Sequence, residues 1–196
     1  MKDQLLFQKL AVLLDYPRAE YLEHVKEVEV LMDKSYSIFY LSWVVISGRI
    51  ERLNLGDLQE CYISSFDVKT DCSLDVGHIL FGEDKKRNNF LIHLREEHDK
   101  AEHDCGKEMP DYLPNLLQLI ALSEDHEFVE ELTVSIILPA LRLMNSRLKP
   151  GDNFYSGLFL LLIDIIEKSY PETDFQEYVP VGKTNCNFSK NHCHHG

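Results

Sequence analysis

The residues best suited to binding a metal ion lie at the C-terminal end of the sequence. They stand in the run CNFSKNHCHHG: Cys186, His192, Cys193, His194 and His195. Thiolates and imidazoles bind zinc, nickel and the iron of iron–sulfur clusters. Six residues separate the two cysteines, whereas a zinc knuckle has about two to four, and adjacent side chains on an extended chain point apart. Two interpretations stay open: a metal-handling or metal-sensing tail, and a flexible tail with adventitious affinity for metals.

A second group of imidazoles recurs every five residues in the middle of the chain, at His93, His98 and His103. Five residues turn a helix by about 500°, so successive histidines are about 140° apart and do not share a face. The spacing also differs from the i, i+4 histidine pairs of zinc proteases. We therefore interpret this stretch as a charged, solvated helix and not as a metal site.

No catalytic motif stands out. The sequence has no nucleophile-elbow serine, no Walker loop and no G-x-G-x-x-G. Because 33 residues are acidic, neighbouring carboxylates are expected and do not indicate an acid–base pair. The residues therefore carry no enzyme signature.

The charge balance limits the classes of partner. Twenty basic residues against 33 acidic ones give 20 − 33 = −13. Such a surface repels nucleic acid and anionic lipid and suits a basic partner. A net negative charge also keeps a protein soluble, and solubility alone would explain the excess of acidic residues.

The same sequence predicts a reduced, cytoplasmic protein. No apolar run reaches the roughly 18–20 residues that span a bilayer, and the first residues, MKDQLLFQKLAVLLDYP, lack the cleavage site of a signal peptide. The five cysteines are odd in number and scattered over the chain, which does not suggest a disulfide framework. We expect neither membrane insertion nor nucleic-acid binding.

An unusual amount of backbone constraint surrounds Asp111 and Tyr112 in the run KEMPDYLPNLLQLIAL. Apolar residues at i, i+3, i+4, i+7 and i+8 from Leu113 predict an amphipathic helix. We expect Asp111 to be its N-cap, with Pro114 in the first turn and Pro110 stiffening the approach. The acid and the aromatic ring would then stand at the mouth of a rigidly started helix.

This pairing of an acid with an aromatic ring occurs twice, as Phe66–Asp67 and Asp111–Tyr112. Between them, Glu83 and Arg87 form an i, i+4 pair near the start of a helix, which a capped surface helix would also explain. Acids beside aromatic rings at helix ends suit a groove that binds a helical or extended peptide with apolar anchors and basic flanks.

The elements that would position these residues are all helical. Apolar periodicity predicts helices at about 5–14, 18–34, 37–50, 54–66, 84–104, 113–122, 125–148 and 152–170. We expect the fifth of these to stop before Gly106 and Pro139 to kink or break the seventh. Strand and hairpin patterns are lacking. The fold class predicted is all-α: a single-domain bundle of about seven to nine helices.

The composition changes after Pro171. Residues 1–170 carry the apolar periodicity, and residues 171–196 are polar with few core-forming side chains. We therefore predict one helical domain, 1–170, followed by a flexible tail, 171–196, that contains the cysteines and histidines named above.

The order of motifs along residues 5–167 resembles the NarJ type of redox-enzyme maturation chaperone, in the TorD/DmsD-like superfamily. LLDYP comes first, and LPALRLM with a long apolar helix comes last. The most specific element, E-x-P-D-[HY]-L-P, is matched at Glu108, Pro110, Asp111, Tyr112, Leu113 and Pro114. The element Y-x-x-x-F-D is matched at Tyr62, Phe66 and Asp67, and G-E-x-x-x-R at Gly82, Glu83 and Arg87.

This resemblance implies a TorD-like helical bundle that is a binding protein rather than an enzyme and has no cofactor of its own. It would bind the N-terminal segment of the apo catalytic subunit of a molybdenum enzyme. Such a chaperone keeps its client open for molybdopterin guanine dinucleotide and withholds it from membrane docking or export. It would be a monomer or a domain-swapped dimer. The expected client-binding residues are Tyr62, Phe66, Asp67, Phe81, Glu83, Arg87, Asp111, Tyr112 and Leu113, with Gly82, Pro110 and Pro114 shaping the backbone.

One departure from the family pattern bears on the client. Nitrate-reductase members often carry Phe-Glu-His-x-His-Gly where this chain has GHILFG, residues 77–82. The client is therefore left open between nitrate reductase and a related molybdenum reductase or dehydrogenase. The alternative function is metal handling or sensing through the C-terminal tail.

Overall fold

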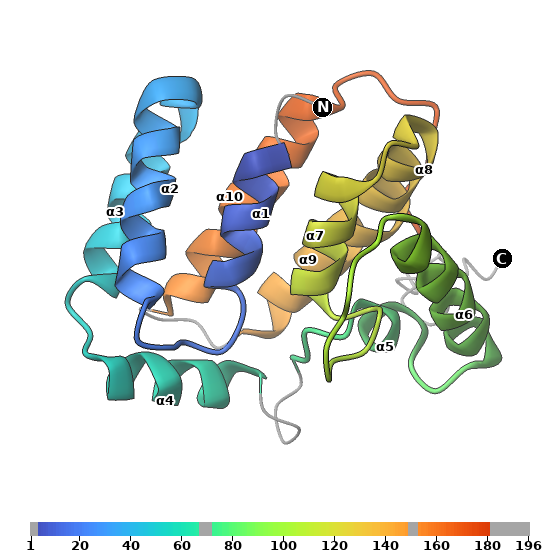
Figure 1. Ribbon diagram of the computed structural model, residues 1–196, viewed down its shortest axis with the longest axis horizontal. Coiled ribbons are helices and arrows are strands. Elements are labelled where there is room, and N and C mark those ends of the chain that lie inside the picture. The colour runs from blue at the N-terminus through green and yellow to red at the C-terminus, as the bar shows by residue number, and fades with distance from the viewer. Residues whose placement is uncertain (1–3, 67–71, 149–152, 181–196) are drawn as a thin grey trace, which may run out of the picture.

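The computed structural model describes residues 4–66, 72–148 and 153–180, and within them the chain is helical, as predicted (Figure 1). The helices are α1 (Gln4–Leu13), α2 (Tyr21–Ser35), α3 (Tyr40–Ile50), α4 (Leu55–Phe66), α5 (Val76–Phe81), α6 (Lys85–Lys100), α7 (Leu113–Leu122), α8 (His126–Glu131), α9 (Leu138–Arg147) and α10 (Phe154–Ser169). A 3₁₀ turn, η1 (Ser37–Phe39), precedes α3, and a π-helical segment, η2 (Leu132–Ile137), joins α8 to α9. These parts of the chain contain no strand, only an isolated antiparallel bridge between Asp75 and Tyr112.

The predicted all-α class is confirmed, and so is the number of helices. Because α8, η2 and α9 follow one another without a break, they form one continuous helix. The described residues thus hold nine separate helices, within the predicted seven to nine.

The core lies between helices that are distant in the sequence. α1 packs against α2 and α7, and α10 packs against α3 and α9. Figure 1 shows α4 lying across one end of these helices, with α5 and α6 at the side of the bundle. The single tryptophan, Trp43 of α3, is fully buried, and α10 buries nine of its 16 residues, which agrees with its nearly all-round apolar sequence.

Pro139 interrupts the regular helix, as expected, and its effect extends to the segment that follows α10. Proline has no N–H, so the carbonyl of Ser135, four residues earlier, lacks its usual α-helical donor. The backbone N–H of Tyr178 donates to that carbonyl at 2.9 Å. The π-helical turns of η2 lie directly before the proline, where π-bulges accommodate such interruptions.

Residues 171–180, the described part of the predicted tail, run along the bundle. The Tyr178 ring packs edge-on against Phe81, with 4.8 Å between ring centroids, and Lys86 lies 5.9 Å from the centre of the Tyr178 ring. Arg142 of α9 pairs with Glu177 and with Glu167 of α10. The predicted boundary at residue 170 and the predicted flexibility stay predictions. The cysteines and histidines of the tail lie outside the described residues, and so does Asp67 of the predicted binding residues.

Among the described helices, none is long and apolar enough to cross a membrane.

Candidate functional site

Asp111 is the centre of the predicted motif residues, but it does not cap α7. The N-cap of α7 is Tyr112, whose side chain makes no capping bond. The Asp111 carboxylate instead accepts hydrogen bonds from the Gly77 N–H and from Arg87 Nε, each at 3.2 Å through Oδ2. The predicted N-cap role is therefore wrong.

The backbone explains why the side chain turns away from α7. Val76 donates its N–H to the Asp111 carbonyl at 2.9 Å, and Leu113 donates to the Leu74 carbonyl at 2.8 Å. These two bonds flank the bridge between Asp75 and Tyr112 and hold residues 111–113 against 74–76. The Asp111 side chain consequently faces the start of α5 and not the first turn of α7.

Gly77 makes this close approach possible. A Cβ atom at position 77 would lie 2.7 Å from Asp111 Oδ2, closer than a real side chain tolerates. The carboxylate is fully buried, and burial raises its pKa above the ordinary value, while Arg87 acts in the opposite direction. Arg87 also lies 3.9 Å from Asp75 and 4.0 Å from Glu83, so it connects three acids.

The neighbouring Tyr112 belongs to a second hydrogen-bond network. Its hydroxyl donates to Asp15 Oδ1 at 3.0 Å and lies 2.8 Å from the hydroxyl of Tyr62. Burial raises the pKa of Tyr62 to about 12 and raises that of Tyr112 further, so both phenols stay protonated. Because Tyr112 gives its proton to Asp15, Tyr62 is the donor to Tyr112.

The aromatic rings around this network form one cluster. Tyr62 packs edge-on against Phe66, with 5.2 Å between centroids, and against Tyr16 at 5.4 Å. Phe66 in turn contacts Tyr155 of α10 at 4.7 Å. Two motifs that are 50 residues apart, at Tyr62 and Tyr112, therefore meet at one place.

The remaining predicted residues are more scattered. Phe81 packs against the rings of Phe90 and Tyr178. Leu113 and Pro114 are buried at the start of α7. The side chain of Glu83, by contrast, is 85% exposed. Gly82 ends α5 with a φ of 61°, a conformation that glycine adopts without strain. Pro110 is buried, and its carbonyl lies 3.0 Å from His98 Nε2.

Asp111 and Tyr112 stand at the start of α7, as expected, but both side chains are buried. Asp111 is 0% and Tyr112 7% exposed, because their partners on α5, α6 and α4 cover them. They hold elements together, and direct contact of either side chain with a client stays a prediction.

A cleft of about 500 Å³ nevertheless opens beside Tyr112, between α1 and the segment that leads into α7. Its lining includes Val12, Asp15 and Arg18 from the α1 side and Glu108 and Tyr112 from the other. Asp15 belongs to the LLDYP motif. Its hydrogen bond with Tyr112, 97 residues away in the sequence, gives this motif a structural role.

No protein-family model matches the chain. Curated relatives do match. The probable nitrate reductase molybdenum cofactor assembly chaperone NarJ of Bacillus subtilis is 25% identical over 171 residues, 84% of this chain and 89% of that protein. The nitrate reductase molybdenum cofactor assembly chaperones NarJ of Escherichia coli K12 and O157:H7 are each 26% identical over 157 residues, 78% of this chain and 66% of those proteins. The predicted resemblance to NarJ-type chaperones is confirmed. All three relatives are named as chaperones and not as enzymes.

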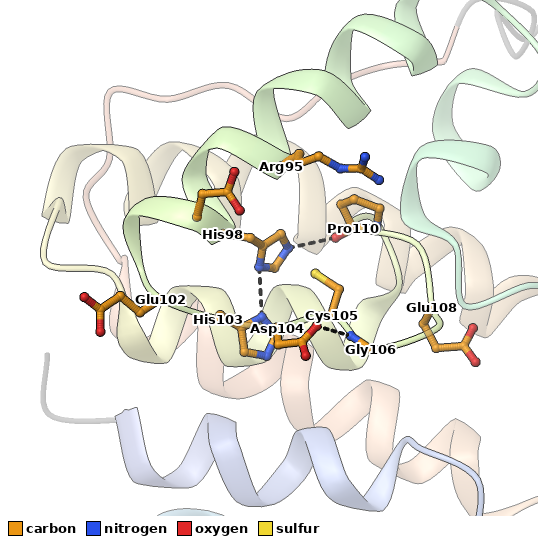
Figure 2. A pocket seen from close by; sticks show the side chains of 10 residues that line it. Arg95, His98, Glu102, His103, Asp104, Cys105, Gly106, Glu108 and Pro110 are labelled. Atoms are coloured by element: carbon orange, nitrogen blue, oxygen red, sulfur yellow. Dashed lines mark hydrogen bonds between the residues drawn. The ribbon is translucent and has the colours of Figure 1, made fainter.

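The structure also brings together two of the histidines that were interpreted as lying on a solvated helix, His98 and His103, with Cys105. His98 and His103 do not diverge on one helix, because α6 ends at Lys100 and not near residue 104. Their Nδ1 atoms lie 2.9 Å apart, and one ligand atom from each histidine and from Cys105 falls within 4.8 Å of the others. Figure 2 shows the sulfur turned toward the imidazoles, while the carboxylates of Glu102 and Glu108 point away.

A reversal of the backbone produces this cluster. The N–H of His103 donates to the His98 carbonyl at 3.0 Å and that of Glu102 to the Asp99 carbonyl at 3.2 Å, a Schellman arrangement. Glu102 takes the left-handed conformation that such a turn requires, with a φ of 52°. Glycine usually occupies that position, so the sequence offered no stop before Gly106, and this is why the helix was predicted to continue.

Proposed function

We propose that the chain is an assembly chaperone that binds the N-terminal segment of the apo catalytic subunit of a molybdenum reductase. The client would be nitrate reductase or a related enzyme, kept competent to receive molybdopterin guanine dinucleotide before docking or export. The observation that carries the proposal is the match to named nitrate reductase assembly chaperones over 78–84% of the chain. The chaperone acts by binding, in the cytoplasm, as a monomer or a domain-swapped dimer, with no cofactor of its own.

The cleft beside Tyr112 is the surface to which we assign the client segment. It combines an apolar strip, to which Val12 and Pro114 contribute, with the carboxylates of Asp15, Asp104 and Glu108. Apolar anchors of a peptide fit the strip, and basic residues that flank them fit the acids. The hydrogen bonds of Asp111 and Tyr112 support this cleft. They connect the segment that leads into α7, which lines the cleft, with the end of α1 and with α4, α5 and α6.

The proposal is tested with a synthetic peptide of the N-terminal segment of the nitrate reductase catalytic subunit from the same organism. We expect the full chain to bind it with a micromolar or tighter Kd in calorimetry. Val12→Asp or Glu108→Lys should weaken binding by about 1–3 kcal/mol, or about 5–150-fold, because each changes an accessible part of the cleft. Both positions are partly or fully exposed, so the fold should persist, and circular dichroism checks this.

Matched control variants test the location. Leu41→Asp places an acid on the outer face of α3, where Leu41 is 79% exposed, and Glu172→Lys reverses an exposed acid beyond α10. Both should leave the Kd unchanged. If Leu41→Asp abolishes binding while Val12→Asp does not, the client site lies on α3 and the assignment to the cleft is wrong. If a folded protein binds no client peptide and no intact apo subunit, the proposed function itself fails.

A further inference from the structure

We propose that His98, His103 and Cys105 form a binding site for a first-row transition-metal ion of the zinc class. This site lies in the helical body and is separate from the cysteines and histidines of the C-terminal tail. Two imidazoles and one thiolate are donors that suit Zn²⁺ and its spectroscopic substitute Co²⁺. The proposal rests on the geometry of the described residues and not on the proposed chaperone function.

The distances between the donors are close to those of a coordinated ion. With metal–nitrogen bonds of about 2.0–2.1 Å, nitrogens 2.9 Å apart subtend about 90° at the metal, and opening them to about 3.4 Å gives the tetrahedral angle. Cys105 Sγ already falls within 4.8 Å of the imidazole donors. A tetrahedral ion requires about 3.6 Å between the sulfur and each nitrogen, so the side chains of His103 and Cys105, which are both half-buried, would have to rotate inward to close the set.

The surroundings of His98 fix the proton on the correct nitrogen. His98 is 2% exposed, and its Nε2 lies 3.0 Å from the Pro110 carbonyl, which can only accept a hydrogen bond. Nε2 therefore carries the proton, and the Nδ1 lone pair accepts a hydrogen bond from the His103 Nδ1–H at 2.9 Å. A metal ion would take the place of that shared proton, which would move to Nε2 of His103. Metal-binding histidines usually donate their second ring N–H to a carbonyl or carboxylate in this way.

Electrostatics also favour a cation here. The adjoining cavity of about 500 Å³ is lined by four carboxylates and one guanidinium: Asp99, Glu102, Asp104, Glu108 and Arg95. A carboxylate or water from this cavity completes the coordination.

The backbone turn gives a further reason to consider a ligand. Glu102 holds a left-handed conformation that costs a residue other than glycine about 1 kcal/mol or more. Without that turn His103 would continue the helix and lie far from His98. An ion held by His98, His103 and Cys105 would offset this strain and tie the end of α6 to the segment that carries Pro110 and Asp111.

The experiment uses full-length protein in which the five tail residues are replaced: Cys186→Ser, His192→Ala, Cys193→Ser, His194→Ala and His195→Ala. Under reducing conditions this protein is titrated with Co²⁺ alone and its absorption recorded. We expect one equivalent to bind, with visible d–d bands and a near-ultraviolet thiolate-to-cobalt band. Native mass spectrometry should count one Zn²⁺ after loading with zinc, and zinc should raise the Tm.

Variants of the site identify the ligands. Cys105→Ser should abolish the thiolate-to-cobalt band, and His103→Gln should abolish stoichiometric binding and the rise in Tm. The matched control Cys61→Ser with His126→Ala changes a half-buried thiol and an imidazole elsewhere, and it should leave the spectrum unchanged. No cobalt binding by the folded tail variant, or binding that survives Cys105→Ser and His103→Gln unchanged, would overturn the proposal.

Discussion

Asp111 is an acid whose partners come from two other helices. Its carboxylate accepts from the Gly77 N–H at the start of α5 and from Arg87 on α6, and its own segment leads into α7. A charge this deeply buried is stable only where donors replace water. The motif residues Asp111 and Arg87 thus join three elements, which is a structural reason for their presence in addition to any contact with a client.

Two substitutions of Asp111 distinguish what its hydrogen bonds contribute to stability from what its charge contributes. Asp111→Ala should lower the free energy of unfolding by about 2–3 kcal/mol, because the Gly77 N–H and Arg87 both lose an acceptor. Asp111→Asn should cost less, since the amide oxygen still accepts from Gly77. Urea unfolding at neutral pH measures both differences.

The pH dependence of the same variants tests the direction of the Asp111 pKa. Burial raises this pKa above the ordinary 3.8, so from that value upward the folded state binds more protons at this site than the unfolded state. Stability from this group is therefore present at low pH and is lost as pH rises through the raised pKa. We expect wild type to lose stability relative to Asp111→Asn as the pH rises above 3.8. A relative gain over that range would mean that Arg87 outweighs burial.

At the scale of elements, two helical glycines have opposite surroundings. A Cβ at Gly157 of α10 would lie 2.8 Å from Ile46 Cγ1 of α3, whereas a Cβ at Gly48 of α3 would meet nothing within 4 Å. The first glycine lets α10 and α3 approach closely. The second has no such role and only weakens its helix.

Alanine at the two positions should therefore have opposite effects. Gly157→Ala should lower the free energy of unfolding by about 1–3 kcal/mol through overpacking, and Gly48→Ala should raise it by about 0.4–1 kcal/mol. Thermal or urea unfolding measures both. In an Ile46→Ala background the cost of Gly157→Ala should disappear, since the clashing atom is gone. If the cost persists there, the contact with Ile46 is not its cause.

Helix ends were predicted less well than helix faces. The Asp84 start of α6 was placed correctly, and its side chain caps the helix by accepting from the Lys86 N–H. The other end was predicted near residue 104 and lies at Lys100. Residues 101–104 contain no glycine or proline and are compatible with a helix, and Glu102 takes a conformation that its type does not indicate. A wrong helix end hid the cluster of His98, His103 and Cys105.

At the scale of the whole molecule, residues 171–180, which follow α10, contact helices that are far from them in sequence. The Tyr178 N–H donates to the carbonyl that Pro139 leaves free in the helix, and its ring covers Phe81. Arg142 and Glu177 add an ion pair at the surface. A proline that would otherwise only weaken a helix thus provides an acceptor for a distant segment.

Removing the Tyr178 ring tests how much this segment contributes. Tyr178→Ala should lower the free energy of unfolding by about 1 kcal/mol, through loss of the aromatic contact with Phe81. Tyr178→Phe keeps the ring and should match wild type. Hydrogen exchange should show faster exchange of the Tyr178-region amides in the alanine variant only. Equal exchange in all three proteins would mean that the ring does not hold the segment.

The sequence by itself determined the all-helical class, most helix positions, the break near Pro139 and the resemblance to NarJ-type chaperones. These depend on apolar periodicity, on proline and on the order of motifs, which are local properties of the chain. Only the tertiary structure decided that Asp111 binds Gly77 and Arg87, that Tyr112 reaches Asp15, and that two histidines rejected as a pair meet beside a cysteine. The contacts of Asp111 and Tyr112 join residues that are 24 to 97 positions apart in the sequence. The meeting of the two histidines depends on the left-handed conformation of Glu102. Local sequence patterns do not report long-range contacts or the conformation of one such residue, which exist only once the backbone is folded.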